Sequence, residues 1–346
     1  MIKRLARHAA AALAVGTRLW PVVPPGRALV LRYHRVGGTP EEPVPLGVSP
    51  EEFDAQLRFL RARCHVVSPS ELVTALGEGR PLAPGTAAIT FDDGYADNFT
   101  TAFPLLQEHG LPAAFFVTTG WIGTHRMLWW DRLREVVHGA IGAPPPAAER
   151  LADVDVPCIE ALTPASLATH HGAAALELAL ATAWRKLRLP PEDMDALIDR
   201  VARALGGPAP PSQGHRPMTW EQVEQLRRAG MEIGSHLASH VRLATAPPER
   251  ARDELVQSKQ RLEQRLGESV NLLAYPEGSL SHDVQVIATE AGYRAAFTTD
   301  VGSVAPGDPL LALRRVGVWG GGYRGTLSLF SPSVFGLQTA RLTRRK

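Results

Sequence analysis

The sequence predicts an α/β fold built on a parallel β-sheet, either doubly wound or closed into a barrel. Short apolar runs alternate with amphipathic helical stretches from residue 28 to residue 318, and this order is typical of parallel strands joined by helices. Several helical stretches end at a glycine, which terminates helices in a left-handed conformation. Apolar residues make up 45% of the 346 residues, enough for a sizeable core.

The elements are expected in a regular order. Strands are predicted at Ala28–Val36, Ala87–Gly94, Ala113–Thr119, Met231–His236, Leu272–Gly278, Ala295–Asp300 and Leu313–Val318. Helices are predicted at Pro50–Arg63, Ser68–Leu76, Asn98–His109, Thr219–Ala229, Pro248–Leu266 and Ser281–Ala291. Ser68 or Ser70 is the expected N-cap of the second helix.

Residues 121–215 interrupt this alternation. They contain several proline clusters and an alanine-rich stretch from 165 to 183, which predict helices joined by proline-rich loops. The main domain is therefore expected in two pieces, 27–120 and 216–320, with a mainly helical insertion between them. An N-terminal segment, 1–26, and a basic C-terminal tail, 321–346, flank it.

Composition excludes several classes of protein. Lys and Arg number 37 and Asp and Glu 35, so the basic excess of a nucleic-acid-binding protein is missing. Two cysteines, Cys64 and Cys158, make no disulfide framework. The apolar run at 9–16 is too short to span a bilayer and resembles a weak signal or membrane-surface segment. The expected location is the cytoplasm or the periphery of the membrane, with secretion or the periplasm as the alternative. Peripheral membrane contact stays open, and no obligate protein partner is inferred.

Two adjacent carboxylates, Asp92 and Asp93, end the second predicted strand. Gly94 allows a turn there, so both side chains can converge on one rim, where a cation would relieve their repulsion. One carboxylate could then ligate a metal while the other acts as a base. A simple Asx turn or helix cap is the plainer interpretation of this motif taken alone.

His236 and His240 follow the fourth predicted strand. Histidines four residues apart can bind one metal from one face of a helical turn. Pro276 precedes Glu277 after the fifth strand and can fix the Glu277 N–H as an oxyanion donor. His34 ends the first strand. Each feature alone has a structural explanation: a solvated pair, a strand-ending turn or a packed histidine.

Together these features lie at the carboxyl ends of predicted parallel strands, where barrel enzymes keep their active sites. Asp93 with two histidines is a three-ligand set that leaves coordination positions open, the catalytic pattern. Asp92 remains as a base, His34 as an acid and the Glu277 N–H as an oxyanion donor. This set suits metal-assisted hydrolysis of an amide or ester.

These motifs resemble those of polysaccharide deacetylases of the NodB-homology type, carbohydrate esterase family four. The resemblance rests on Thr-Phe-Asp-Asp-Gly-Tyr at 90–95, on the two histidines at 236 and 240, and on Ala-Tyr-Pro at 274–276. Tyr-His-Arg-Val at 33–36 and Leu-Arg-Arg-Val at 313–316 support it. The resemblance covers roughly the two pieces of the main domain.

The resemblance implies a distorted barrel of about seven parallel strands that removes N-acetyl groups from amino sugars. It implies that Asp92 is the general base and that Asp93, His236 and His240 hold a divalent metal, usually zinc, although other divalent ions substitute. The expected substrate is an N-acetylated polysaccharide, oligosaccharide or lipid-linked glycan.

Three positions depart from the family pattern. Leu237 follows the first metal histidine in place of Ser or Thr. Ala274 stands where the family often has arginine, and Arg315 could orient Asp92 instead. The last strand lacks the histidine that often acts as the acid, so His34 is assigned that role; in a closed barrel the first and last strands are neighbours.

Tyr275, Trp129 and Trp130 are the candidate substrate-binding residues, since exposed tryptophans can stack on sugar faces. The plainer interpretation is that the tryptophans pack the insertion onto the barrel. Two other functions stay open: a carbohydrate-binding barrel without activity, and a metal-dependent amidase or esterase with a non-sugar substrate.

Overall fold

The computed structural model describes residues 23–37, 46–142, 169–205, 207, 215–320, 331, 335–336 and 338–339. Nearly all of the predicted N-terminal segment and basic tail lie outside these residues, as do Cys158 and the proline clusters at 144–146 and 208–211. Contacts divide the chain into two compact units. The barrel unit includes residues 46–122 and 218–320, and the helical unit comprises Gly123–Pro217. The domain boundaries expected from the sequence remain predictions.

Seven parallel strands of the described residues close into a barrel. Strand β1 pairs with β10 on one side and with β5 on the other, which completes the ring. The order around it is β1, β10, β9, β8, β7, β6 and β5. The strands are β1 (Leu29–Tyr33), β5 (Thr86–Phe91), β6 (Ala114–Val117), β7 (Glu232–Ser235), β8 (Leu272–Ala274), β9 (Ala295–Val301) and β10 (Leu313–Gly317). The closed barrel, rather than the doubly wound sheet, is confirmed.

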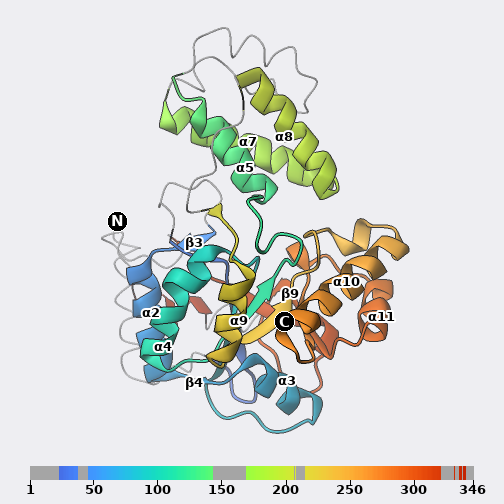
Figure 1. The fold of residues 1–346 in the computed structure, drawn as a ribbon. Helices are drawn as coiled ribbons and strands as arrows, with labels where there is room; N and C mark the ends of the chain where they lie inside the picture. The colour runs from blue at the N-terminus through green and yellow to red at the C-terminus, as the bar shows by residue number, and fades with distance from the viewer. Residues whose placement is uncertain are drawn as a thin grey trace. The chain divides into compact units, whose positions relative to one another are not determined.

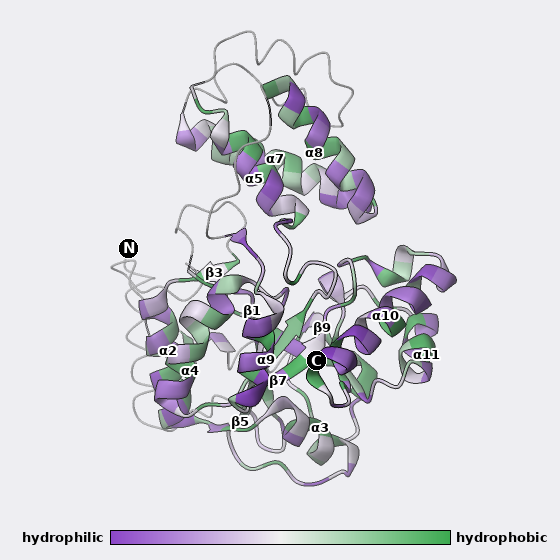
Figure 2. Ribbon diagram, viewed as in Figure 1, coloured by the Kyte–Doolittle hydropathy of each residue, from purple (hydrophilic) through white to green (hydrophobic). Residues whose placement is uncertain are grey.

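Helices surround these strands, as Figure 1 shows for the barrel unit. They are α2 (Pro50–Arg63), α3 (Pro69–Gly77), α4 (Phe103–His109), α9 (Trp220–Arg228), α10 (Pro248–Leu266) and α11 (His282–Glu290). Helix α10 is largely hydrophilic in Figure 2 and meets the barrel through a few buried residues such as Leu255 and Leu262. None of the described helices combines the length and apolarity needed to cross a membrane.

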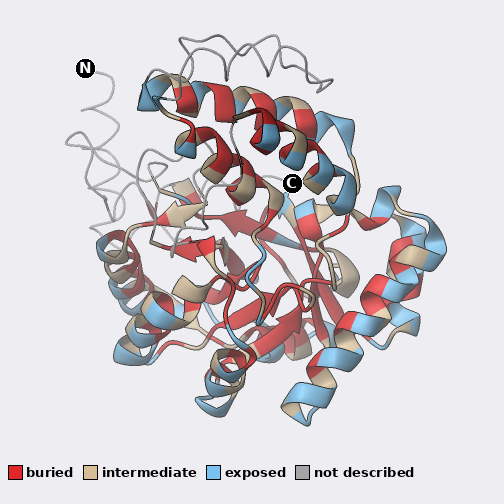
Figure 3. Cartoon of the chain, turned by 45° about the horizontal axis from the view of Figure 1, so that its top comes forward, coloured by how far each residue is buried: buried red, intermediate tan, exposed pale blue. Residues whose placement is uncertain are grey.

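Side chains alternate between the two faces of the strands. Leu29 and Leu31 of β1 belong to the apolar cluster that packs against α2, whereas Val30 belongs to a second cluster. This second cluster draws small residues such as Ala88 and Ala114 from strands around the ring, together with residues of α3. It therefore fills the barrel interior, and the strands appear almost entirely buried in Figure 3. Alternate residues such as Val30, Arg32 and His34 thus share the inward face.

Most predicted elements are confirmed, and the differences have local causes. The helix expected at Asn98–His109 begins as a π-helical turn, η1 (Asn98–Ala102), because Pro104 lacks the N–H that a regular turn requires. The fifth predicted strand ends at Ala274, and Pro276 begins the short turn η6 (Pro276–Gly278). The first predicted strand divides at His34 into β1 and β2 (Arg35–Val36). Ser68, rather than Ser70, caps α3 by accepting a hydrogen bond from Glu71 N–H.

Two very short strands had no sequence pattern to predict them. Strand β3 (Gly47–Val48) pairs with β2, and β4 (His65–Val66) pairs with β5 outside the ring. A two-residue strand is too short to show an apolar alternation.

The helical unit has its own apolar core. Its described helices are α5 (Trp129–Gly139), α7 (His170–Leu187) and α8 (Pro191–Leu205). Leu133, Leu180, Trp184 and Ile198 are fully buried among them. Arg132 of α5 binds Asp195 and Asp199 of α8, at 2.6 and 2.5 Å.

Gly234 of β7 lies at a closely packed point of the barrel interior. Its replacement by alanine tests how tightly the interior is packed there. A Cβ at this position would lie 2.4 Å from two ring atoms of Phe116. We expect Gly234→Ala to lower the free energy of unfolding by about 1–3 kcal/mol, measured by urea denaturation.

Gly77 at the end of α3 provides the matched control, because its added Cβ would meet only a terminal methyl group of Leu310, at 3.3 Å. We expect Gly77→Ala to change the same free energy by less than about 0.5 kcal/mol. Equal losses in the two variants would contradict the close packing at Gly234.

Candidate metal and catalytic site

The polar residues singled out in the sequence gather at the carboxyl ends of the strands. Asp92 and Asp93 follow β5, His236 follows β7, and Glu277 lies in the turn after β8. All seven strands run in the same direction, so these ends share one mouth of the barrel.

The backbone at this mouth is strained. Four of the five described non-glycine residues with positive φ lie in these segments: Asp93 (76°), Leu237 (67°), His240 (58°) and Glu277 (53°). Such conformations are unfavourable for residues with a Cβ and persist where the surrounding structure imposes them. The barrel thus holds the turns after β5, β7 and β8 in conformations that isolated segments would avoid.

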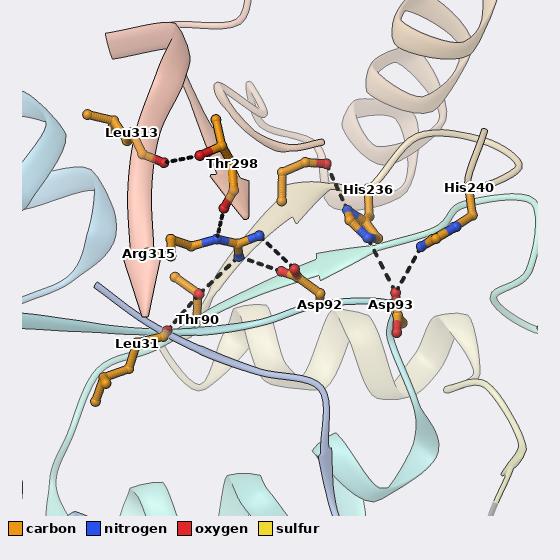
Figure 4. Close-up of polar contacts among 10 residues, drawn as sticks. Leu31, Thr90, Asp92, Asp93, His236, His240, Thr298, Leu313 and Arg315 are labelled. Atoms are coloured by element: carbon orange, nitrogen blue, oxygen red, sulfur yellow. Dashed lines mark hydrogen bonds and ion pairs between the residues drawn. The ribbon is translucent and has the colours of Figure 1, made fainter. Parts of the chain in front are cut away.

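Asp93, His236 and His240 form one buried cluster (Figure 4). Asp93 Oδ1 lies 3.3 Å from Nε2 of His236 and 3.4 Å from Nε2 of His240. The other carboxylate oxygen of Asp93, Oδ2, is buried without a hydrogen-bond partner. Three potential ligand atoms within 4.8 Å of one another could hold a metal ion.

The hydrogen bonding of His236 supports a cation in this cluster. Its Nδ1 lies 2.7 Å from the carbonyl oxygen of Ala274, and a carbonyl can only accept, so Nδ1 must donate the proton. In a neutral imidazole Nε2 then carries a lone pair, which faces a carboxylate oxygen. A positive charge has to offset this contact. Ligand atoms about 2.0–2.1 Å from a tetrahedral zinc ion lie about 3.3–3.4 Å apart, so the spacing fits a divalent metal.

Charge in the cluster also shifts its protonation. Burial alone would raise the pKa of Asp93, but the adjacent imidazoles of His236 and His240 hold it well below its usual range. Burial lowers the pKa of His240, yet the bond to Asp93 outweighs this and raises it. The carboxylate is therefore ionised and available as a ligand at neutral pH.

Helix α10 anchors the segment between the two histidines. Glu254 accepts hydrogen bonds from the backbone N–H groups of Ala238 and Ser239, at 3.0 and 2.9 Å, and contacts the Ser239 hydroxyl. Leu237 is fully buried in the cluster that includes Leu255, which explains an apolar residue directly after the first histidine. No sequence motif marks Glu254, although the helical periodicity of α10 already places this buried acidic residue on the inner face.

Arg315 of β10 clamps Asp92. Its two terminal nitrogens each donate to one oxygen of Asp92 at 2.7 Å, and its Nε donates to the carbonyl of Thr298 at 2.9 Å (Figure 4). Burial raises the pKa of Asp92, and the Arg315 guanidinium reverses this, so the net shift is downward. Asp92 is therefore a fixed, ionised carboxylate beside the cluster, and Arg315 is positioned as the sequence suggested.

His34 follows β1 on its inward face and is half-buried. Its carbonyl accepts a hydrogen bond from Asn98 Nδ2 at 2.7 Å. Burial lowers the pKa of His34 to about 4, and the nearby Arg32 adds to this, while Asp93 and Asp92 oppose it. The imidazole is therefore neutral at pH 7 in the metal-free protein, whereas the expected acid role begins from the protonated form.

Of the other predicted site residues, Glu277 lies in the turn after β8 and Tyr275 is buried directly before that turn. Glu277 has its carboxylate paired with Arg242 and its backbone in a left-handed conformation, and the role of its N–H as an oxyanion donor remains a prediction. Tyr275 is fully buried in the cluster that also contains Leu237 and Leu255, and its hydroxyl has no partner there. The ring of Tyr275 therefore packs beneath the surface, and contact with substrate remains a prediction.

Trp129 and Trp130 begin α5 in the helical unit. Trp130 is buried, and Trp129 packs against that unit's core, with Arg185 over its ring at 6.0 Å. These contacts lie within the helical unit, so the packing of the tryptophans onto the barrel and their role in sugar binding both remain predictions.

The sequence is similar to that of a known protein family. A family model described as polysaccharide deacetylase matches residues 79–143 and 174–296, more than half of the chain. YxkH of Bacillus subtilis (strain 168), itself assigned to the polysaccharide deacetylases, is 20% identical over 295 residues, which are 85% of this chain and 72% of YxkH.

Solved structures share the fold at low sequence identity. The deacetylase PplD of Streptococcus pyogenes, in complex with acetate, is 21% identical with a TM-score of 0.57, covering 91% of this chain and 99% of PplD. IcaB from Ammonifex degensii is 19% identical with a TM-score of 0.58, covering 91% of this chain and 96% of IcaB.

Replacement of Arg315 tests the clamp through the dependence of stability on pH. In the metal-free wild type the lowered pKa of Asp92 stabilises the fold above the unfolded value, about 3.9, and this contribution is lost as the pH falls. In Arg315→Met burial is unopposed by the guanidinium, so the pKa of Asp92 rises and its ionisation destabilises the fold as the pH increases. We expect a loss of about 3–5 kcal/mol near neutral pH, shrinking towards about pH 4.5.

Arg314→Met provides the matched control, because Arg314 is the exposed neighbour on the same strand. We expect its free energy of unfolding to stay within about 0.5 kcal/mol of the wild type at both pH values. A loss in Arg315→Met that did not depend on pH would show that Arg315 acts by packing alone.

Proposed function

Because the chain belongs to the polysaccharide deacetylase family, we propose that it is a metal-dependent hydrolase that removes N-acetyl groups from amino-sugar-containing glycans. The observation that carries the proposal is the buried cluster of Asp93, His236 and His240 beside the clamped carboxylate of Asp92. A ligand set and an adjacent separate base are the parts that hydrolysis of an unreactive amide requires.

Asp93, His236 and His240 would hold the divalent ion, for which zinc is the first candidate. When bound, such an ion supplies Lewis-acid chemistry: it polarises a carbonyl group and makes water more acidic. The hydrogen bond from His236 to Ala274 orients that ring and keeps its Nε2 directed at the cluster. Binding of the metal would thus depend on residues from the ends of two strands, β5 and β7.

Asp92 would act as the general base. Both its oxygens accept from Arg315, but a carboxylate has about four lone-pair sites, so each oxygen can still accept a proton from water. The clamp prevents Asp92 from rotating towards the cluster and becoming a ligand. The pairing with Arg315 also keeps Asp92 ionised, as a base must be at the start of the reaction.

His34 would act as the acid that protonates the leaving amine. Its position on the inward face of β1 brings it to the mouth where Asp92 and Asp93 lie, and their charges favour its protonated form. Since the imidazole starts neutral, it must gain its proton within the catalytic cycle. The Glu277 N–H would stabilise the negative charge that develops on the acyl oxygen.

Metal removal and ligand replacement test the proposed chemistry. We expect treatment with a chelator, and Asp93→Ala, to lower acetate release from N-acetylated oligosaccharides by at least about 100-fold, equivalent to about 2.7 kcal/mol. Metal analysis should show about one divalent ion per wild-type chain and none in Asp93→Ala. Asp92→Asn should lose activity but keep the metal.

Asp300→Ala provides a control, since Asp300 is an exposed carboxylate at the end of β9 and should keep both metal and activity. Full acetate release by metal-free protein would contradict the proposal. Release from non-sugar acetamides at rates equal to those from glycans would favour the alternative amidase.

Two substrates, one with a poor and one with a good leaving group, distinguish an acid role of His34 from a structural role. We expect His34→Gln to keep its metal and to slow amide hydrolysis by about 100–10,000-fold, the usual contribution of a general acid. Hydrolysis of p-nitrophenyl acetate should fall far less, because nitrophenolate leaves without a proton. Equal losses on the two substrates would contradict the acid role.

A further inference from the structure

Arg32 is a charged residue on the inward face of the barrel that the proposed chemistry does not use. It lies between Val30, which packs in the barrel interior, and His34, at the mouth. Its strand neighbours Leu31 and Tyr33 point outward into the apolar layer. The alternation of the strand therefore directs Arg32 towards the top of the interior, beside the catalytic residues.

The guanidinium of Arg32 is incompletely satisfied. Its Nε is buried and has no hydrogen-bond partner, which is unfavourable for a charged donor. Asp92, whose charge acts on Arg32, already receives both terminal nitrogens of Arg315. The barrel thus holds two arginines near Asp92, and only Arg315 is clamped to it.

Gly317 leaves a space that Arg32 shares with a tryptophan. Arg32 and Gly317 are partners in the β1–β10 register. The position that a Cβ of Gly317 would occupy lies 3.1 Å from Nη2 of Arg32 and 3.0 Å from Cζ3 of Trp319. The guanidinium and the indole therefore border one point at the mouth, where any side chain at position 317 would intrude.

Trp319 remains accessible there, with 42% of its surface exposed. It lies two residues beyond the end of β10 and so on the same mouth as Asp92 and His236. An exposed indole offers a flat apolar face of the kind that contacts the C–H face of a sugar ring.

The charge of Arg32 persists at neutral pH. Burial lowers the pKa of its guanidinium to about 10, with Arg315 adding to the effect and Asp92 and Asp93 opposing it. A guanidinium presents Nε and one terminal nitrogen along the same edge, which matches the two oxygens of a carboxylate or phosphate. The Nε of Arg32, which has no hydrogen-bond partner, lies on that edge of the guanidinium.

We propose that Arg32 and Trp319 form a subsite for an acidic sugar, in which the indole contacts the sugar ring and the guanidinium binds its anionic substituent. This rests on the proposed function, because the subsite would position an N-acetylated glycan over the metal cluster. The substrate class is then a glycan with a phosphate or carboxylate group on or next to the acetylated sugar, rather than a neutral polymer.

Paired substrates in the full-length, metal-loaded protein test this subsite. The probes are N-acetylglucosamine, its 1-phosphate and N-acetylmuramic acid, compared by kcat/KM for acetate release. Their binding to Asp92→Asn is measured by calorimetry. We expect the wild type to prefer one of the acidic sugars by at least about tenfold. A phosphate preference indicates a phosphorylated glycan, and a preference for the muramic acid indicates a carboxylate.

The variants are Arg32→Met, Arg32→Lys, Trp319→Ala and Arg314→Met. We expect Arg32→Met to abolish the preference for acidic sugars, mainly through KM, while leaving the neutral sugar within about twofold. Arg32→Lys should keep part of the preference, Trp319→Ala should weaken all three sugars, and the exposed control Arg314→Met should change none.

The subsite is overturned if the wild type shows no preference, or if Arg32→Met and Arg32→Lys both weaken neutral and acidic sugars equally. Failure of the proposed function gives a different result. In that case no sugar releases acetate, while calorimetry on Asp92→Asn with and without Arg32→Met still reports whether binding of acidic sugars depends on Arg32.

Discussion

Two neighbouring carboxylates buried at one end of a closed barrel are the constraint on which the site depends. Asp92 and Asp93 are 2% and 1% exposed, and two negative charges so close together are unfavourable without positive partners. The fold provides each carboxylate with different partners. Arg315 from β10 binds Asp92 through two hydrogen bonds, and His236 and His240 surround Asp93. This division separates a base from a set of metal ligands.

The strained backbone follows from the same constraint. Consecutive residues on a strand point to opposite faces, so Asp93 can turn towards the histidines only if the strand ends and the chain adopts a positive φ. Gly94 continues that turn with a φ of 94°, where a Cβ would lie 2.9 Å from Ile122. The left-handed conformation of His240 likewise brings its ring back towards Asp93. The cost of these conformations is offset by packing around the mouth.

Much of the barrel and of the site could be predicted from the sequence, because short apolar runs, prolines and glycines act locally. Helices α2 and α10 have the predicted bounds, and the motifs around Asp93 and His236 are recognisable in the sequence alone. Local patterns could not predict β3 and β4, which are too short to alternate. They also could not show that Tyr275 turns into the helix layer, because burial of an aromatic ring depends on what packs over it.

The sequence by itself determined the α/β class, the order of the strands along the chain and the residues able to carry the chemistry. Only the tertiary structure decided that the sheet closes, since closure requires β1 to pair with β5 and β10, far apart in sequence. Closure also brings Arg315 to Asp92 across 223 residues and sets Arg32 opposite Gly317. The neutralisation of buried charges and the space beside a glycine both depend on distances in three dimensions. A pattern along the sequence does not contain these distances.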